Sequence, residues 1–396
     1  MTQDTNSLRR DFEAMIKAAL HAADPFAAVK RYLQMDGSEL FVDSKPVGLH
    51  GYDRVLLISV GKAAFPMASA VTSIIGTRLT SGVIVTKYGH VDSTSSLMNA
   101  SRLTIIESAH PVPDENSLKA GEVVAHSLEN LDEHTLVLAC ISGGASALMI
   151  SPYPGIQLRT MRALNDALLK SGADIGEMNL VRSRLERLKN GGFVALAKPA
   201  TVIGLIVSDV IGDPLSVIAS GLTNHPAAHN NLVANNEQAC LAVAAQAQQL
   251  GYKPRIVTTS LQGEASARGR DIANAIAAQS AGTCLIYGGE PTVTIHGNGL
   301  GGRNQELALA AAIALGELPE AHASLCALAT DGTDGPTQAG GAFIFPDTLA
   351  RARSKQLEPS AYLVRNDSYH FFEALGDLIM TGPTGTNVAD VVIALR

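Results

Sequence analysis

The stretch RVLLISVGKAAFPMASAVTSII, residues 54–75, places an apolar run, a turn and an alanine-rich segment one after another. RVLLISV predicts a strand that ends at Val60, Gly61-Lys62 forms the turn, and the rest predicts a helix. Similar apolar runs open SGVIVTKYGH (81–90), LTIIESAHPVPDENSLKAGEVVAHSL (103–128) and TLVLACISGGASALM (135–149). Fully apolar strands that alternate with helices predict an α/β fold with a Rossmann-like, mainly parallel sheet covered on both faces.

Lys62 stands where the first of these strands ends. This position matters because ligands of parallel α/β sheets bind at the carboxyl ends of the strands. The GxxxxGK[ST] pattern of a P-loop is absent, since Ala63 follows the lysine. A lysine at a helix start faces the positive end of the helix dipole, which disfavours it. The placement therefore indicates an anionic ligand near Lys62, with an exposed surface lysine as the alternative.

A second turn, Ser142-Gly143-Gly144-Ala145-Ser146, also joins a strand to a helix. Two glycines, two hydroxyls and a helix start can cradle a phosphate, because backbone N–H groups become accessible there. The GxSxG spacing of an esterase nucleophile is absent. We predict phosphate binding by Ser142, Gly143, Gly144 and Ser146. The alternative is a tight turn whose serines cap the helix.

Two further predicted strand ends carry titratable side chains. His110 opens the rigid turn HPVPD, where a lone histidine is more often structural than a base. TVIGLIV (201–207) predicts another strand, and Ser208-Asp209 follows it. A carboxylate at a strand end serves as a base, as a metal ligand or as a cap of the next helix.

The most glycine-rich stretch is GGEPTVTIHGNGLGGRNQE (288–306). TVTIH (292–296) alternates as a short strand would, and a helix is predicted after the loop. Glycines before a helix start, with Arg303 as a planar donor fork, indicate a grip on phosphate or carboxylate. Residues 297–302 also spell GxGxxG, but no acidic strand end follows about twenty residues later, as a dinucleotide site requires. A glycine-rich turn with an exposed arginine is the alternative.

At 396 residues the chain is longer than one hydrophobic core usually serves, so two domains are expected. The loop NHPAAHNN (224–231) breaks the pattern of strands and helices, and we predict a domain of residues 1–245 and a second, smaller α/β domain of residues 246–396. In the second, SLCALA (324–329) predicts a strand that runs into two acids, Asp331 and Asp334. The loop GPTGTN (382–387) precedes a closing strand.

Composition excludes several classes of protein. A net charge of −7 and the absence of Trp argue against a nucleic-acid partner. The apolar runs are too short to span a membrane, and the N-terminal residues have helical spacing without a cleavable signal, so a cytoplasmic location is expected. The widely spaced cysteines predict buried free thiols: Cys140, Cys240, Cys284 and Cys326.

Eight motifs, in order along nearly the whole chain, resemble the glycerate 2-kinase family, whose second domain is known as MOFRL. They are GKAA (61–64), TKYGH (86–90), HPVPDENS (110–117), SGGASAL (142–148), SDVIGDP (208–214), GGEPTVT with GLGGRNQE (288–306), TDGTDGPT (330–337) and GPTGTNVAD (382–390). The resemblance implies a two-domain enzyme that uses ATP and Mg²⁺ to phosphorylate the 2-hydroxyl of D-glycerate in a cleft between the domains. It implies that Lys62 and Arg303 are catalytic.

The remaining roles follow from combining the resemblance with the loops. We expect Asp209 to accept the hydroxyl proton. We expect phosphate contacts from Gly299, Gly301 and Gly302, substrate contacts from Asn304, Glu306, Thr384 and Asn387, and Mg²⁺ near Asp331 or Asp334. A homodimer is compatible with these expectations.

Three segments depart from the family pattern. Ala145 replaces a glycine of SGGGSA, RSRLERLKNGG (182–192) replaces a His-Leu-Ser…Lys-Gly-Gly segment, and Ser220-Gly221-Leu222-Thr223 replaces SGPT. Another small 2-hydroxy acid is therefore an alternative substrate. The alternative classes are an NAD(P)H-dependent hydroxypyruvate reductase and a nucleotide-binding module without catalysis.

Overall fold

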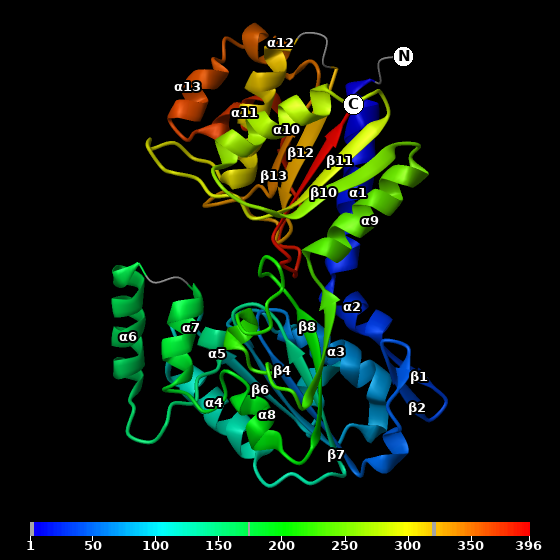
Figure 1. The fold of residues 1–396 in the computed structure, drawn as a ribbon, viewed down its shortest axis with the longest axis vertical. Coiled ribbons are helices and arrows are strands. Elements are labelled where there is room, and N and C mark those ends of the chain that lie inside the picture. The colour runs from blue at the N-terminus through cyan, green and yellow to red at the C-terminus, as the bar shows by residue number, and fades with distance from the viewer. Residues whose placement is uncertain (1–3, 173–174, 319–321) are drawn as a thin grey trace. The chain divides into compact units, whose positions relative to one another are not determined.

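The computed structural model describes residues 4–172, 175–318 and 322–396, and it consists of two compact units (Figure 1). One unit comprises Asp24–Ala234. The other joins the N-terminal segment, which ends at Ala23, to Asn235–Arg396. Among the described residues, no helix has the length and apolar character needed to cross a membrane.

A six-stranded sheet forms the centre of the unit Asp24–Ala234, in the order β6-β5-β4-β7-β8-β9, and all its neighbouring strands are parallel. The strands are β4 (Arg54–Val60), β5 (Ser81–Lys87), β6 (Leu103–Ser108), β7 (Thr135–Ile141), β8 (Thr201–Val207) and β9 (Ala228–Ala234). The chain starts in the middle, runs outward to β6 and returns to β7 beside β4. This is the strand order of a Rossmann fold, and its switch point lies between β4 and β7.

Helices cover both faces of this sheet, and β4 is therefore buried on both sides. Leu56, Ile58 and Val60 share a core with α4 and α8, whereas Ser59 Oγ donates to Ala64 O at the start of α3 (2.7 Å). Figure 1 shows α3 and the pair α4 and α8 on opposite sides of the strands. The helices are α2 (Pro25–Tyr32), α3 (Ala64–Ile75), α4 (Glu115–Leu128), α5 (Ala145–Leu148), α6 (Leu158–Ser171), α7 (Ile175–Ser183) and α8 (Gly192–Ala197).

Short elements complete this unit. An antiparallel sheet contains β1 (Leu33–Asp36), β2 (Glu39–Val42) and β3 (Lys45–Pro46), and 3₁₀ turns lie at Leu49–Gly51, Gly76–Arg78, Ser96–Asn99 and Ile218–Ser220. The interpretation of residues 224–231 as a loop was wrong at its end, since β9 begins at Ala228. Its polar side chains suit an edge strand: Asn230 Nδ2 donates to Thr223 O (2.8 Å) and Asn231 Nδ2 donates to Gly204 O (3.2 Å).

The second unit contains a mixed sheet in the order β10-β11-β15-β12-β13-β14. Only β10 and β11 are parallel in it, and the other neighbouring pairs are antiparallel. The strands are β10 (Lys253–Leu261), β11 (Thr283–Gly289), β12 (Ser324–Ala329), β13 (Gly341–Ile344), β14 (Leu378–Ile379) and β15 (Asp390–Leu395). The predicted closing strand, β15, is therefore a central strand of its sheet.

Two groups of helices cover the faces of the mixed sheet. Helices α10 (Ala265–Ala277), α11 (Arg303–Gly316), α12 (Thr348–Ser354), α13 (Pro359–Val364) and α14 (Ser368–Leu375) lie on one face, and α1 (Thr5–Ala23) and α9 (Asn236–Gln249) lie on the other (Figure 1). The four cysteines are buried and free.

Helix α1 belongs to this unit because it contributes to its core. The Phe12 ring centroid lies 6.0 Å from that of Phe343, and Arg9 pairs with the buried Asp377 at 2.6 Å. The units thus divide the chain at Asp24 and Asn235, whereas the sequence predicted domains of residues 1–245 and 246–396. The difference arises because α1 and α9 pack on the mixed sheet.

The predicted strand at residues 292–296 was wrong. Residues 290–302 form a loop in which Thr292 makes a single bridge with Glu264. The Thr294 backbone N–H and hydroxyl donate to the Glu264 carboxylate (3.0 and 2.9 Å). Bonds to a side chain thus replace the backbone ladder that the alternating pattern predicted.

Candidate active site

Two turns that follow neighbouring strands, β4 and β7, are bonded together at the switch point of the parallel sheet. Lys62 N donates to Gly143 O (2.9 Å), and Ala63 N donates to Ser142 Oγ (3.0 Å). Gly61 has φ +126°, and a Cβ on it would lie 2.2 Å from Ser142 Oγ. The two turns therefore form one fixed structure, and only glycine fits at Gly61.

Three polar side chains lie against the glycines of the second turn. A Cβ on Gly143 would lie 2.1 Å from Asp209 Oδ2. A Cβ on Gly144 would lie 3.1 Å from His110 Cδ2 and 3.3 Å from Lys62 Cγ. The structure thus brings Lys62, Asp209 and His110 together around two residues without side chains.

His110 is half-buried among cationic groups. Burial first, and then the charges of Lys62, Lys87 and His90, lower the pKa of His110 from 6.5 to about 4. At neutral pH the imidazole is therefore uncharged, and it can donate one hydrogen bond and accept another. Sequence reasoning gave His110 a structural role. Its position could have indicated a role in the site, because His110 stands two residues after the last residue of β6, just as Lys62 stands two residues after Val60.

The hydroxyl of Ser146 is bonded within the protein. Ser146 Oγ lies 2.7 Å from Ser220 Oγ, which donates to Asn179 Oδ1 (3.1 Å). Ser220 is buried and has φ +56°, and its carbonyl accepts from Asn190 N (2.9 Å). The departures from the family pattern at residues 182–192 and 220–223 therefore meet beside the second turn.

Arg303 opens α11 and is held by two carboxylates. Nε and Nη2 donate to Asp390 Oδ2 and Oδ1 (2.5 and 2.9 Å), and Nη1 lies 2.8 Å from Glu290 Oε1. Burial raises the pKa of Asp390 to about 7, against the opposing effect of Arg303. Burial alone would lower the pKa of Arg303, but its bond with Asp390 and the neighbouring acids raise it. Asp390, which sequence reasoning did not single out, is thus the main partner of the predicted catalytic arginine.

Asp334 caps the start of α11. Asn304 N and Gln305 N donate to its two carboxylate oxygens (3.1 and 2.8 Å). Burial raises the pKa of Asp334. Two N–H groups at this helix start, where the sequence predicted a bound anion, therefore already have an acceptor within the protein.

The glycines of residues 297–302 pack against the same unit. A Cβ would lie 2.3 Å from Arg365 O if placed on Gly297, and 2.5 Å from Asp367 Cβ if placed on Gly299. Side chains are excluded there by the protein's own backbone and neighbouring loop. The GxGxxG pattern is thus explained by packing, without a dinucleotide.

A cavity of about 480 Å³ nevertheless adjoins this loop. The predicted residues Gly299, Gly301, Gly302, Arg303 and Glu306 line it, together with apolar side chains such as Val293 and Ile295. Burial raises the pKa of Glu306, whose Oε2 accepts from Asn366 Nδ2 (2.9 Å). These residues share one cavity, and their predicted roles in binding stay predictions.

The other predicted substrate residues have partners in the fold. Asn304 is fully buried, and its amide nitrogen lies 3.3 Å from Asp334 Oδ1. Thr384 Oγ1 donates to Thr330 O (2.6 Å), and Asn387 Oδ1 accepts from Ala389 N (3.0 Å). The structure thus assigns each of the three a contact that stabilises a loop or a helix start.

The two acids predicted to hold Mg²⁺ differ in what they contact. Asp331 Oδ1 accepts from Thr333 N (2.9 Å), which leaves Oδ2 outside this bond. Both oxygens of Asp334 accept N–H groups at the start of α11, and its predicted role as a metal ligand stays a prediction. Within residues 4–172, 175–318 and 322–396, no group of three or more His, Cys, Asp or Glu side chains is arranged to hold a metal ion.

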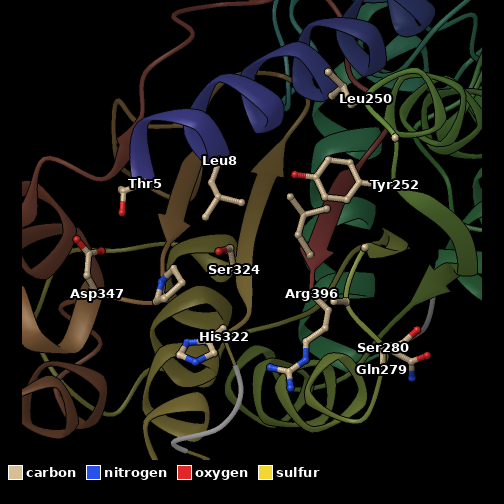
Figure 2. Close-up of a pocket in the computed structure, with 15 residues that line it drawn as sticks. Thr5, Leu8, Leu250, Tyr252, Gln279, Ser280, His322, Ser324, Asp347 and Arg396 are labelled. Carbon is tan, nitrogen blue, oxygen red and sulfur yellow. The ribbon is translucent and has the colours of Figure 1, made fainter. Parts of the chain in front are cut away.

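Another cavity of the second unit lies elsewhere, and Figure 2 shows its lining. It measures about 730 Å³ and adjoins the residues where β10 and β12 begin and β15 ends. Thr5 and Leu8 of α1 line it together with Tyr252, which precedes β10, and Ser324, the first residue of β12 (Figure 2). It contains none of the predicted site residues, and it adjoins the amino end of β10, away from the edge where such sheets bind ligands.

The fold and the turns define a class of protein: a two-unit α/β protein with two joined glycine turns at the switch point of a Rossmann sheet. Two family models match this chain. A domain of unknown function, DUF4147, matches residues 11–250, and the MOFRL family matches residues 283–390.

Relatives and solved structures narrow the class. The chain is 37% identical to D-glycerate 2-kinase of Thermotoga maritima, over 99% of both chains. A protein of Agrobacterium vitis, 37% identical over 99% of this chain and 95% of its own, carries a provisional name as a hydroxypyruvate reductase. A crystal structure of glycerate kinase from Thermotoga maritima superposes with a TM-score of 0.88 at 36% identity, over 98% and 99% of the two chains. The chain belongs to the glycerate 2-kinase family with a C-terminal MOFRL domain.

Proposed function

We propose that the protein is an ATP-dependent kinase that transfers the γ-phosphoryl group to the 2-hydroxyl of D-glycerate. The names of its relatives suggest the substrate. The observation that carries the proposal is the joined pair of turns at the switch point, where Lys62 and the Gly143-Gly144 turn meet. A cation beside side-chain-free backbone at the carboxyl ends of parallel strands suits phosphate groups.

The site residues have different roles in the proposed phosphoryl transfer. This reaction needs alignment and neutralisation of charge more than covalent catalysis. We assign the Lys62 ammonium to the transferred phosphoryl group and the Gly143-Gly144 turn to the phosphates of the nucleotide. We assign the Arg303 guanidinium to an anionic group of the reaction, because its bonds to Asp390 and Glu290 fix the guanidinium plane and leave further N–H donors.

Mg²⁺ belongs to the proposal as a partner of ATP. In kinases it neutralises charge on the phosphates, and it is usually held by one or two carboxylates with the phosphates themselves. Asp331 is the residue that we assign to this role, since Oδ2 is outside its bond to Thr333.

The reductase alternative receives no support from the glycine loop. A dinucleotide site needs the glycines for close approach of the pyrophosphate at a strand–helix turn. Here a loop of residues 290–302 separates β11 from α11. The space beside Gly297 and Gly299, where a pyrophosphate would have to approach, is occupied by Arg365 and Asp367.

A coupled assay tests the function and its alternatives together. ATP consumption would be measured with Mg²⁺ across a panel of short 2-hydroxy acids, and NADH oxidation with hydroxypyruvate. We expect turnover with ATP, fastest with D-glycerate, and none with NADH. Faster turnover of another hydroxy acid would keep the kinase and change its substrate, whereas NADH oxidation without ATP consumption would reject the kinase.

A further inference from the structure

His110 is held in place by its own loop. Ala109 N donates to Asp114 Oδ1 (3.3 Å), and Asp114 Oδ2 accepts from the Tyr88 hydroxyl (2.6 Å). Asp114 also caps α4 through Ser117 N (2.9 Å). Ala109, which precedes His110, is thus tied to Asp114, and Asp114 in turn binds Tyr88 and the start of α4, so the loop that carries His110 is fixed.

The ring edge with Nε2 faces the point where phosphate is expected. A Cβ on Gly144 would lie 3.3 Å from His110 Nε2 and 3.3 Å from Lys62 Cγ. One small volume is therefore bounded by the Gly144 backbone, the lysine stem and an imidazole nitrogen. If Lys62 contacts the transferred phosphoryl group, the attacking hydroxyl must approach the same volume.

The imidazole also has suitable chemistry. Its pKa, lowered to about 4, is comparable to that of an aspartate, the residue with which protein kinases accept the substrate proton. At neutral pH it is ready to accept a proton, and unlike a carboxylate it does not cancel the charge of Lys62. Besides Lys62, the charges of Lys87 and His90 also lower the pKa of His110.

We propose that His110, rather than Asp209, is the residue that accepts the proton of the substrate hydroxyl. The inference rests on the proposed kinase activity. As the 2-hydroxyl oxygen bonds to the γ-phosphorus, the bond from that phosphorus to the β–γ bridging oxygen breaks, and its electron pair leaves with ADP. The hydroxyl proton passes to His110 Nε2 and is then released to water.

Matched histidine variants test the role. His110→Asn and His110→Gln should lower kcat by roughly 10²-fold or more, as loss of a general base does, with KM for ATP little changed. The control is His126→Asn, because His126 is exposed on α4 and should keep wild-type turnover. Circular dichroism and ATP binding establish that each variant is folded. A kcat within twofold of wild type for His110→Asn, or an equal loss in the control, would overturn the proposal.

A second measurement separates this inference from the proposed function. The His110 imidazole pKa would be followed by NMR in the whole protein. We expect it to rise when inorganic pyrophosphate binds and in Lys62→Met, because each change reduces positive charge near the ring. A pKa that responds to neither would refute the placement of His110 at the anion site. Absence of turnover with every acid in the wild type, by contrast, would reject the kinase itself.

Discussion

At the scale of single residues, burial raises the pKa of Asp390, a side chain that no sequence motif singled out as functional. Its carboxylate is 1% exposed and bonded to Arg303 through two nitrogens. In the printed sequence it is one acid at the start of an apolar strand. Arg303 could be singled out from its glycine loop, but its partner lies 87 residues away in the chain and is apparent only from the fold.

The raised pKa of Asp390 gives a prediction for stability. The folded protein binds this proton more tightly than the unfolded chain, with a pKa of about 7 against 3.8. The stabilisation from this group is therefore complete below about pH 4 and lost as pH rises through 7. Asn at this position cannot titrate, so the stability of Asp390→Asn relative to wild type should rise between pH 5 and pH 8.

Thermal unfolding of both proteins at pH 5, 6, 7 and 8 measures this difference. The midpoint of Asp390→Asn relative to wild type should rise with pH. Parallel curves across the series would show that Asp390 does not titrate in this range.

Gly144 gives a second prediction at the same scale. Its φ of +86° strains any other residue, and a Cβ would press on His110 and Lys62. Gly155 has φ +91° with open space around it, so Gly155→Ala is a matched control for the backbone term. Both variants should lose ~1 kcal/mol of stability, but only Gly144→Ala should lose turnover, by roughly tenfold or more. Similar kcat values in the two variants would mean that the turn is not at the site.

At the scale of elements, the strands of the parallel sheet could be predicted because each is a continuous apolar run. The secondary structure was predicted wrongly in segments where polar side chains make the hydrogen bonds. Residues 292–296 have the alternating pattern of a strand, but Thr294 bonds to the Glu264 carboxylate. The start of β9 was predicted as a loop because it is rich in asparagine, and in the fold the Asn230 side chain donates to a neighbouring backbone carbonyl. Position after a strand was the better guide to the site: Lys62, His110 and Asp209 each stand two residues after a strand's last residue.

The start of α11 gives a prediction that separates a helix cap from a metal ligand. Asp334→Asn should destabilise the protein by ~1 kcal/mol or more, because it weakens two bonds at a helix start, and should leave the Mg²⁺ requirement within twofold. Asp331→Asn should instead raise the Mg²⁺ concentration for half-maximal activity by roughly tenfold, as loss of a ligand does. Titrations with Mg²⁺ at saturating ATP, beside thermal midpoints, measure both; the reverse pattern would exchange the two roles.

At the scale of the whole molecule, the α/β class and two-part organisation were predictable, since hydrophobic periodicity and length fix them. The unit to which α1 belongs could not be predicted. Its amphipathic spacing predicts a docked helix but cannot name the surface, and Phe12 packs against Phe343 more than 300 residues away. The expectation that the two units share one active site stays a prediction.

Lys62 and Arg303 test that expectation. If both stabilise charge on one phosphoryl group, each single Ala variant should lose roughly 10²-fold in kcat. The double variant should then lose less than the product of the two factors, because coupled groups are not additive. Steady-state rates of the four proteins measure the coupling. Losses that multiply, or Arg303→Lys with full activity, would indicate separate or nonspecific roles.

The most direct test of the account is phosphorus NMR of the product that the protein forms from D-glycerate, ATP and Mg²⁺. We expect 2-phosphoglycerate from wild type, and none at a comparable rate from folded Lys62→Ala. Formation of 3-phosphoglycerate alone, or no phosphorylated acid at all, would contradict the assigned reaction. A Lys62→Ala rate within twofold of wild type, a difference of only ~0.4 kcal/mol, would contradict the assigned site.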